Sequence, residues 1–174
     1  MLEKKWLVQK AKKGDEEAFF ALISSHKEQL YRIAYSYLKN EADSLEAIQE
    51  VTYRAFKGIK KLKQADYFST WLVRIMINYC RDEWKKKKRE PIMQVKMKEP
   101  YTEDNNLQLE VQEAISLLGD PYQTVIQLRY MEDFMIKDIA KVMDSSENTV
   151  KTWLRKGLEK LRQYWDEKGG SEHV

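Results

Sequence analysis

The chain has 174 residues, of which 43% are hydrophobic and 34% charged, and it contains only 6 Gly and 3 Pro. This composition is typical of a soluble, folded protein and leaves little material for a fold with many tight turns. Residues 1–90 hold 20 Lys and Arg against 13 Asp and Glu, whereas residues 111–174 hold 9 against 11, so the positive charge lies in the first half.

Three helices are predicted in the first half, because apolar residues recur at spacings of three and four. The first has its buried face at Ala18, Leu22, Leu30, Ile33, Ala34, Tyr37 and Leu38. The second has its buried face at Leu45, Ile48, Val51, Ala55 and Ile59. Gly14-Asp15 can start the first helix, and the short turn 39–41 predicts that the two lie antiparallel. The polar stretch 60–67 is expected to be a loop.

The third helix is expected to begin near Ser69-Thr70 and to continue into a strongly basic run, residues 85–89. Its predicted buried stripe consists of Trp71, Leu72, Ile75, Met76 and Tyr79. The basic run favours a polyanionic partner, most simply nucleic acid. A solvated helix end is the alternative interpretation of such a run.

The chain changes character after Arg89. Residues 90–108 include Pro91, Pro100 and many charges without a sustained period, which predicts a flexible linker. Helical periodicity resumes over 109–168, and residues 169–174 form a tail. Within that second part, Gly119 can end one helix and Asp120-Pro121 can open the next. We therefore predict an all-α protein with two small helical domains, residues 1–89 and 109–168.

The second domain contains a predicted helix-turn-helix. A short amphipathic helix with Ile136, Ile139, Ala140 and Met143 is followed by the polar turn 144–146. Ser146 can cap a second helix, whose predicted inner face is Val150, Leu154, Leu158 and Leu161. Its outward side chains are Asn148, Lys151, Thr152, Arg155 and Lys156. These have the reach and the donors for base edges and phosphates in a major groove, although an ordinary helical hairpin has the same pattern.

Together the two halves resemble the extracytoplasmic-function (ECF) sigma factors of bacterial RNA polymerase. The stretches that carry the resemblance in the first domain are Gly14–Phe19, Glu46–Glu50 and Phe68–Ile75. Those in the second domain are Pro121–Ile126, Asp138–Ala140 and Asn148–Thr152. Their order and spacing cover about 145 residues of the chain, and no single stretch decides the match.

The resemblance implies a division of labour in the first domain. The helix that carries Glu46, Gln49 and Glu50 would bind, together with the helix before it, a coiled coil of the largest subunit of core polymerase, unless these side chains simply face solvent. At the −10 element, Tyr67, Phe68, Asn78 and Arg81 would handle the melted strand, and Lys85, Lys86, Lys87 and Lys88 would meet phosphates of the duplex just upstream. In this set Tyr67 and Phe68 would offer faces for base stacking, and the lysines would contact phosphates. Trp71 and Cys80 are interpreted as packing residues.

The resemblance also implies that Asn148, Lys151, Thr152, Arg155 and Lys156 read the −35 element as duplex DNA. The partners would be promoter DNA, core polymerase through its coiled coil and flap, and an anti-sigma factor. The alternative function is a helix-turn-helix activator or repressor that acts without polymerase. That alternative leaves the basic helix and the aromatic loop of the first domain without a purpose.

No chemistry of an enzyme is indicated. His26 and His173 are isolated, no cluster has metal-ligand spacing, and no Gly-rich phosphate loop is present. We expect no catalytic residues, metal, cofactor or small-molecule substrate. No apolar run reaches the roughly 18 residues that cross a bilayer, the N-terminus lacks the features of a signal peptide, and Cys80 is a lone cysteine. A cytoplasmic location, not in the membrane, is therefore expected.

Overall fold

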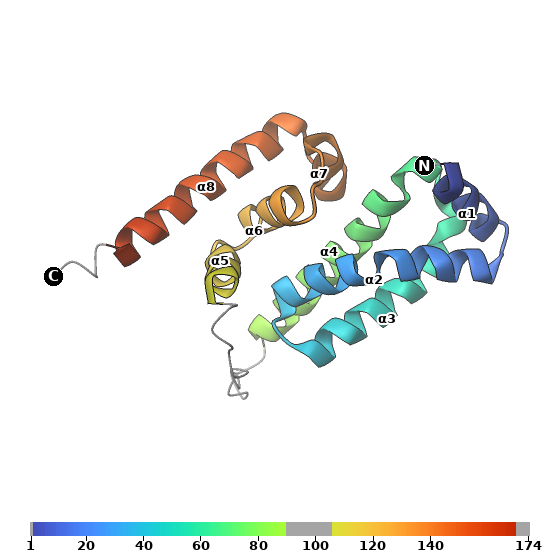
Figure 1. Ribbon diagram of the computed structural model, residues 1–174, viewed down its shortest axis with the longest axis horizontal. Coiled ribbons are helices and arrows are strands. Elements are labelled where there is room, and N and C mark those ends of the chain that lie inside the picture. The colour runs from blue at the N-terminus through green and yellow to red at the C-terminus, as the bar shows by residue number, and fades with distance from the viewer. Residues whose placement is uncertain (1, 90–105, 170–174) are drawn as a thin grey trace. The chain divides into compact units, whose positions relative to one another are not determined.

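The computed structural model describes residues 2–89 and 106–169, and every regular element in these ranges is a helix (Figure 1). Internal contacts divide the chain into two compact units, one ending at Lys88 and the other beginning at Arg89. The prediction of an all-α protein with two helical domains is confirmed. Across these residues, none of the helices has the length and apolar character to span a membrane.

The first unit contains four helices and two short 3-10 turns. The helices are α1 (Leu2–Lys12), α2 (Glu16–Leu38), α3 (Glu41–Gly58) and α4 (Phe68–Arg89). The turns, η1 (Ile59–Lys61) and η2 (Ala65–Tyr67), occupy the stretch predicted as a loop. Helix α1 was not predicted from the sequence. It packs on α2 and buries Val8 and Ala11, a stripe of only two small apolar residues that periodicity alone does not reveal.

The N-terminal ends of α2 and α3 are set by side-chain caps. The Asp15 carboxylate accepts a hydrogen bond from the Ala18 amide at 2.9 Å, and the Asn40 side chain accepts one from the Asp43 amide at 2.9 Å. Each cap satisfies a backbone donor that the first helical turn leaves unpaired. Between the two helices Lys39 is left-handed, with φ 52°, which reverses the chain. The predicted start of α2 and the turn at 39–41 are confirmed.

Helix α4 is rotated relative to the prediction. Its buried residues are Phe68, Thr70, Leu72, Val73, Met76, Ile77, Tyr79 and Cys80. Trp71 and Ile75, both expected in the core, are only half-buried. The Trp71 indole lies against Gly58, where an added Cβ would be 3.0 Å from its Cζ2 atom, so a side chain at this position would require the indole to shift slightly. Cys80 is buried as expected, and burial raises the pKa of its thiol to about 12.

The second unit consists of α5 (Asn106–Leu117), α6 (Tyr122–Ile126), a π-helical turn (Gln127–Met131), α7 (Ile136–Met143) and α8 (Glu147–Gly169). Helix α5 begins at Asn106, three residues before position 109, where the second domain was predicted to begin. Most of the predicted linker, 90–105, and the tail from 170 onward lie outside the described residues. The chain reverses at Gly119, with φ +67°, as expected from its place after a helix.

The helix-turn-helix is present, with one error in the predicted packing. The buried residues of α8 are Val150, Leu154, Gly157 and Leu161, whereas Leu158 is 43% exposed. A Cβ added to Gly157 would lie 2.7 Å from the Ile126 side chain, so α8 approaches α6 closely at this glycine. A search for apolar side chains overlooks such a position, because the residue that occupies the inward site has no side chain.

Candidate nucleic-acid interface

One side of α4 faces away from the core of the first unit. Asn78 and Lys85 are exposed and Arg81 is half-exposed, at successive spacings of three and four residues. With 3.6 residues per turn these three lie on one side of the helix, opposite the buried Met76 and Cys80. We call Asn78, Arg81 and Lys85 the α4 outer face. The sequence predicted all three as site residues, and the structure places them together.

The basic run at the end of α4 is exposed, but several of its cations are already engaged. Lys86 donates to Glu83 at 2.6 Å, and Lys87 forms an ion pair with Asp43 of α3. Lys88 lies over the Trp84 ring, 3.9 Å from its centroid. A bound phosphate would therefore have to compete with two carboxylates. Exposed ion pairs of this kind contribute only about 0–1 kcal/mol, so phosphate can displace them readily.

Phe68 corrects the predicted loop site. It is 0% exposed, with its ring 5.4 Å from the His26 ring and 5.9 Å from that of Trp71, so it cannot offer a face to a base in this structure. Tyr67 is half-buried just before it. Of the two aromatic residues predicted to stack on bases, Phe68 is therefore a core residue and Tyr67 lies at the surface, because α4 begins between them.

A polar network centred on the buried His26 holds the start of α4. Lys4 of α1 donates to Ser69 Oγ at 2.6 Å, and both Lys4 Nζ and Ser69 Oγ lie within 3.0 Å of His26 Nε2. His26 Nδ1 lies 2.7 Å from the Leu22 carbonyl, so a neutral ring with its proton on Nδ1 satisfies every partner. Burial lowers the pKa of both His26 and Lys4. This network joins three helices and was missed because its members are far apart in sequence.

In the second unit, the turn of the helix-turn-helix is built without glycine. Asp144 takes the left-handed conformation, with φ 52°, which short polar residues tolerate better than most. Ser146 Oγ accepts a hydrogen bond from the Thr149 amide at 3.1 Å and so caps α8, as predicted. These two residues fix the direction in which α8 leaves the turn.

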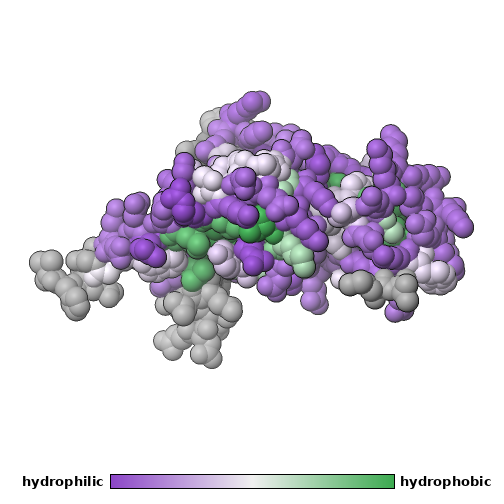
Figure 2. All heavy atoms as spheres, turned by 90° about the horizontal axis from the view of Figure 1, so that it is seen from above, coloured by the Kyte–Doolittle hydropathy of each residue, from purple (hydrophilic) through white to green (hydrophobic). Residues whose placement is uncertain are grey.

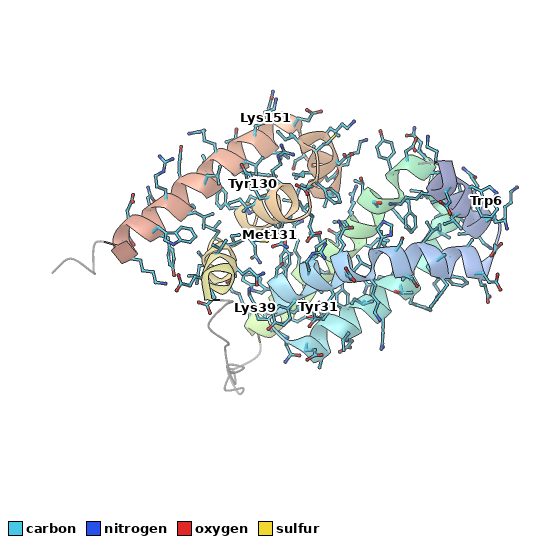
Figure 3. All side chains as sticks on the ribbon, in the orientation of Figure 1. Trp6, Tyr31, Lys39, Tyr130, Met131 and Lys151 are labelled. Atoms are coloured by element: carbon cyan, nitrogen blue, oxygen red, sulfur yellow. The ribbon has the colours of Figure 1, made fainter. Side chains whose placement is uncertain are left out.

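The predicted recognition residues are all exposed on α8. They are Asn148, Lys151, Thr152, Arg155 and Lys156. Lys151 lies near the N-terminal end of the helix (Figure 3). Arg155 is held by Glu159 at 2.9 Å, and Thr152 donates to the Asn148 carbonyl at 3.0 Å. The opposite side of α8 packs on α6 and α7. The outward set can thus enter a groove while the inward set keeps the helix in place.

The outer surface of α3 carries the third predicted set. Glu46 and Gln49 are exposed, while Glu50 is half-buried and pairs with Arg54 at 2.7 Å. Burial and the carboxylates of Glu83, Glu46 and Glu50 raise the pKa of Tyr79 in α4 to about 12.

Much of the surface drawn in Figure 2 is hydrophilic, so exposed apolar side chains are notable. On α3 these are Leu45, Tyr53 and Phe56, which share a side with Gln49. Leu45 was predicted in the buried face of this helix and is instead 43% exposed, whereas sequence reasoning overlooked Tyr53 and Phe56.

No group of His, Cys, Asp and Glu residues that could hold a metal ion occurs in the described part of the chain. The outer sides of α4 and α8 are basic or amide-bearing and suit binding to an extended polyanion, whereas the outer side of α3 is acidic and apolar.

Comparison with known proteins identifies the family. Sequence models match two regions: Sigma-70 region 2 over residues 22–90, and Sigma-70, region 4 over residues 108–161. The ECF RNA polymerase sigma factor SigW of Bacillus subtilis is 30% identical over 174 residues, covering 90% of this chain and 93% of SigW. The chain belongs to the ECF sigma factors. The sigma factor SigV of the same organism is 29% identical and covers 88% of this chain and 94% of its own length.

Solved structures share the fold. CnrH, determined in complex with the cytosolic domain of CnrY, matches with a TM-score of 0.77 at 22% identity, over 95% of this chain and 98% of CnrH. The sigma factor RpoE of Bartonella quintana matches with a TM-score of 0.68 at 16% identity, over 87% of this chain and 96% of its own. The predicted function, a sigma factor for transcription initiation, is confirmed, and an activator or repressor independent of polymerase is not favoured.

The His26 network predicts an acid-sensitive first unit. Because burial lowers the pKa of His26 in the folded protein, the unfolded chain binds more protons near pH 6. The stabilisation that neutral His26 gives to the folded first unit is therefore complete above the ordinary histidine pKa of about 6.5. It is lost as the pH falls toward the lowered pKa of His26 in the folded protein. We expect the thermal midpoint of the wild type to fall between pH 7.5 and pH 5.5 by more than that of His26→Gln. Equal falls in the two proteins would contradict this role of His26.

Proposed function

We propose that this sigma factor reads promoter DNA in two states, with the second unit binding the −35 duplex and the first unit binding the separated −10 strand. The proposal is carried by one observation in each unit. Helix α4 of the first unit and helix α8 of the second each have a polar or basic side that is exposed and an opposite side that is buried. We further propose that it is a cytoplasmic binding protein and not an enzyme, acting without metal, cofactor or small-molecule substrate.

The −35 contacts are assigned to the outward set on α8. Lys151 and Lys156 are exposed cations suited to phosphates, and Arg155 can donate in a bidentate manner to a guanine edge. Arg155 would have to leave Glu159, an exchange between two exposed partners. The capped start of α8 adds backbone amides that favour phosphate.

The −10 contacts are assigned to the α4 outer face and the basic run. Asn78 carries an amide that can pair with an unstacked base, and Arg81 and Lys85 lie one and two turns beyond it along the same side. Lys86, Lys87 and Lys88 then contact phosphates of the upstream duplex, which contributes affinity more than sequence information. Tyr67 is kept as a candidate for base stacking, and Phe68 supports the loop from the core.

Core polymerase is proposed to bind α3 through Glu46, Gln49 and Glu50, by the coiled coil of its largest subunit, and to bind the second unit through its flap. The carboxylates and the amide suit an Arg-rich partner helix. An anti-sigma factor is a further proposed partner, since a related structure is of RpoE with the anti-sigma factor NepR.

The polymerase assignment is tested by the paired substitutions Gln49→Ala and Glu50→Lys. Each should weaken binding to core polymerase about tenfold or more, because a contact at the centre of an interface is typically worth over about 1 kcal/mol. The thermal midpoint should stay near the wild-type value, since neither side chain is in the core. Titration of labelled core enzyme gives the affinity. Glu3→Lys, a charge reversal at an exposed position of α1, serves as the control, and wild-type affinity in both test variants would place the interface elsewhere.

The basic run is expected to act by charge. Replacing Lys85, Lys86 and Lys87 with Ala should weaken promoter binding by the holoenzyme about equally on all sequences. The plot of log affinity against log salt should flatten by up to about 0.9 for each phosphate that the variant no longer neutralises. Lys13→Ala, at an exposed turn after α1, should leave the slope unchanged. An altered sequence preference with the wild-type slope would be evidence against phosphate binding by this run.

Asn78 is expected to act only once the strands part. Asn78→Ala should reduce open-complex formation on duplex promoters, as measured by permanganate footprinting, and should spare binding to the −35 element. Arg155→Ala should instead weaken −35 binding by roughly 1–3 kcal/mol, the usual value of a bidentate pair with a base. A template already unpaired at −10 separates two roles: a defect that vanishes there assigns Asn78 to opening, and one that persists assigns it to base recognition. Normal opening on both templates would remove Asn78 from the site.

A further inference from the structure

Helix α1 contacts the loop that connects α3 to α4. This connecting loop, residues 59–67, comprises η1, η2 and the residues between them, and α1 packs against both turns as well as against α2. Lys12 Nζ donates to the Leu62 carbonyl at 2.6 Å. Lys5 Nζ lies 2.9 Å from Asp66 Oδ1. Helix α1 therefore holds the connecting loop at two points, one near each turn.

Both contacts come from one side of α1. Lys5, Val8 and Lys12 follow one another at spacings of three and four, so with 3.6 residues per turn they share a side of the helix. Val8 is 0% exposed and Lys12 is half-buried. Because Val8 fixes this side of α1 against the core, the two ammonium groups are brought to the loop by the packing of the helix.

The two turns of the connecting loop close on themselves. The Leu62 amide donates to the Ile59 carbonyl at 3.1 Å, which closes η1. The Tyr67 amide donates to the Gln64 carbonyl at 3.2 Å, which closes η2. These bonds set the shape of each turn but not the position of one turn relative to the other. The contact of Lys12 with the backbone fixes that position, since a charged donor makes a stronger hydrogen bond than a neutral one.

The ion pair between Lys5 and Asp66 changes the charge that the connecting loop presents. Asp66 is the only acidic residue in the loop. The loop also carries three exposed lysines, Lys60, Lys61 and Lys63. With its carboxylate paired to α1, the loop offers cations to solvent, which suits a polyanionic strand. An exposed pair of this kind contributes little to stability, so its effect is on the surface of the loop more than on folding.

We infer that α1 holds the connecting loop in the shape that receives the separated −10 strand, and that Lys12 is the positioning residue. This inference rests on the proposed function, in which Tyr67 of this loop stacks on a base, and it extends that function to a helix with no role so far. Lys12 acts through the backbone at Leu62 and does not touch DNA. A loop already held in its binding shape loses less conformational freedom when the strand binds, which raises the affinity for a strand that fits.

The first test measures the connecting loop in the free, full-length protein. Lys12→Met keeps an unbranched side chain but removes the ammonium donor, and Lys13→Met removes the same charge at the next position, which is exposed. Amide hydrogen exchange over residues 62–67 should be faster in Lys12→Met and unchanged in Lys13→Met, because local opening becomes easier without the contact. Lys12→Arg keeps a cationic donor and should restore slow exchange. Wild-type exchange in Lys12→Met would overturn the inference.

The second test measures binding of the holoenzyme to a single strand with the −10 sequence of a promoter that it opens, and to a scrambled strand. Lys12→Met should lower the affinity for the −10 strand by about three- to tenfold, because one charge-assisted hydrogen bond no longer restrains the loop. The affinity for the scrambled strand should stay near the wild-type value, and Lys13→Met should leave the ratio of the two affinities unchanged.

Two other results would give Lys12 a different role and overturn the inference. If Lys12 only stabilised the fold, Lys12→Met would lower the thermal midpoint and weaken binding to both strands equally. If Lys12 contacted a phosphate, the variant would also weaken binding to both strands, and the dependence of binding on salt would become less steep.

Tyr67→Ala separates failure of the inference from failure of the proposed function. A lowered ratio of the two affinities in Tyr67→Ala beside a normal ratio in Lys12→Met would overturn the inference alone. Normal ratios in both variants would mean that the connecting loop does not read the strand, which overturns the inference and the −10 role of Tyr67 together. A lowered ratio in Lys12→Met that returns in Lys12→Arg supports the inference.

Discussion

The burial of Phe68 is the constraint on which the first unit depends. Its side chain is 0% exposed and packs at the start of α4 against His26, so the rotation of α4 about its axis is set at its first residue. Once that rotation is set, the 3.6-residue period places Met76 and Cys80 inward and Asn78 and Lys85 outward. The side of α4 assigned to DNA is therefore a consequence of core packing several turns away.

In the second unit a glycine has the corresponding role. Gly157 lets α8 approach Ile126 so closely that a single added carbon would be only 2.7 Å from its side chain. The inward position taken by Gly157 turns Leu158 toward solvent and leaves Arg155 and Lys156 on the outside. Close helix packing thus decides which residues the recognition helix presents, as dense packing commonly does in small helical domains.

The predicted DNA-binding cations are paired with acidic side chains in the free protein. Lys86 lies on Glu83, Lys87 on Asp43 and Arg155 on Glu159. Because these pairs are exposed, each contributes at most about 1 kcal/mol and can be exchanged for a phosphate. The pairing opposes the binding of a single phosphate, so these cations bind DNA best where several phosphates lie together.

Helix content, the two-domain organisation and the outward set on α8 could be predicted from the sequence, because helical periodicity and caps such as Asp15 and Ser146 act over a few residues. The site residues on α4 followed from the resemblance to the family, because periodicity alone placed the buried side of that helix incorrectly. The family likewise follows from short ordered motifs. The burial of Phe68, the inward place of Gly157 and the network of Lys4, His26 and Ser69 depended on tertiary structure. Each joins residues distant in the chain, and local patterns carry no information about which distant residues will meet.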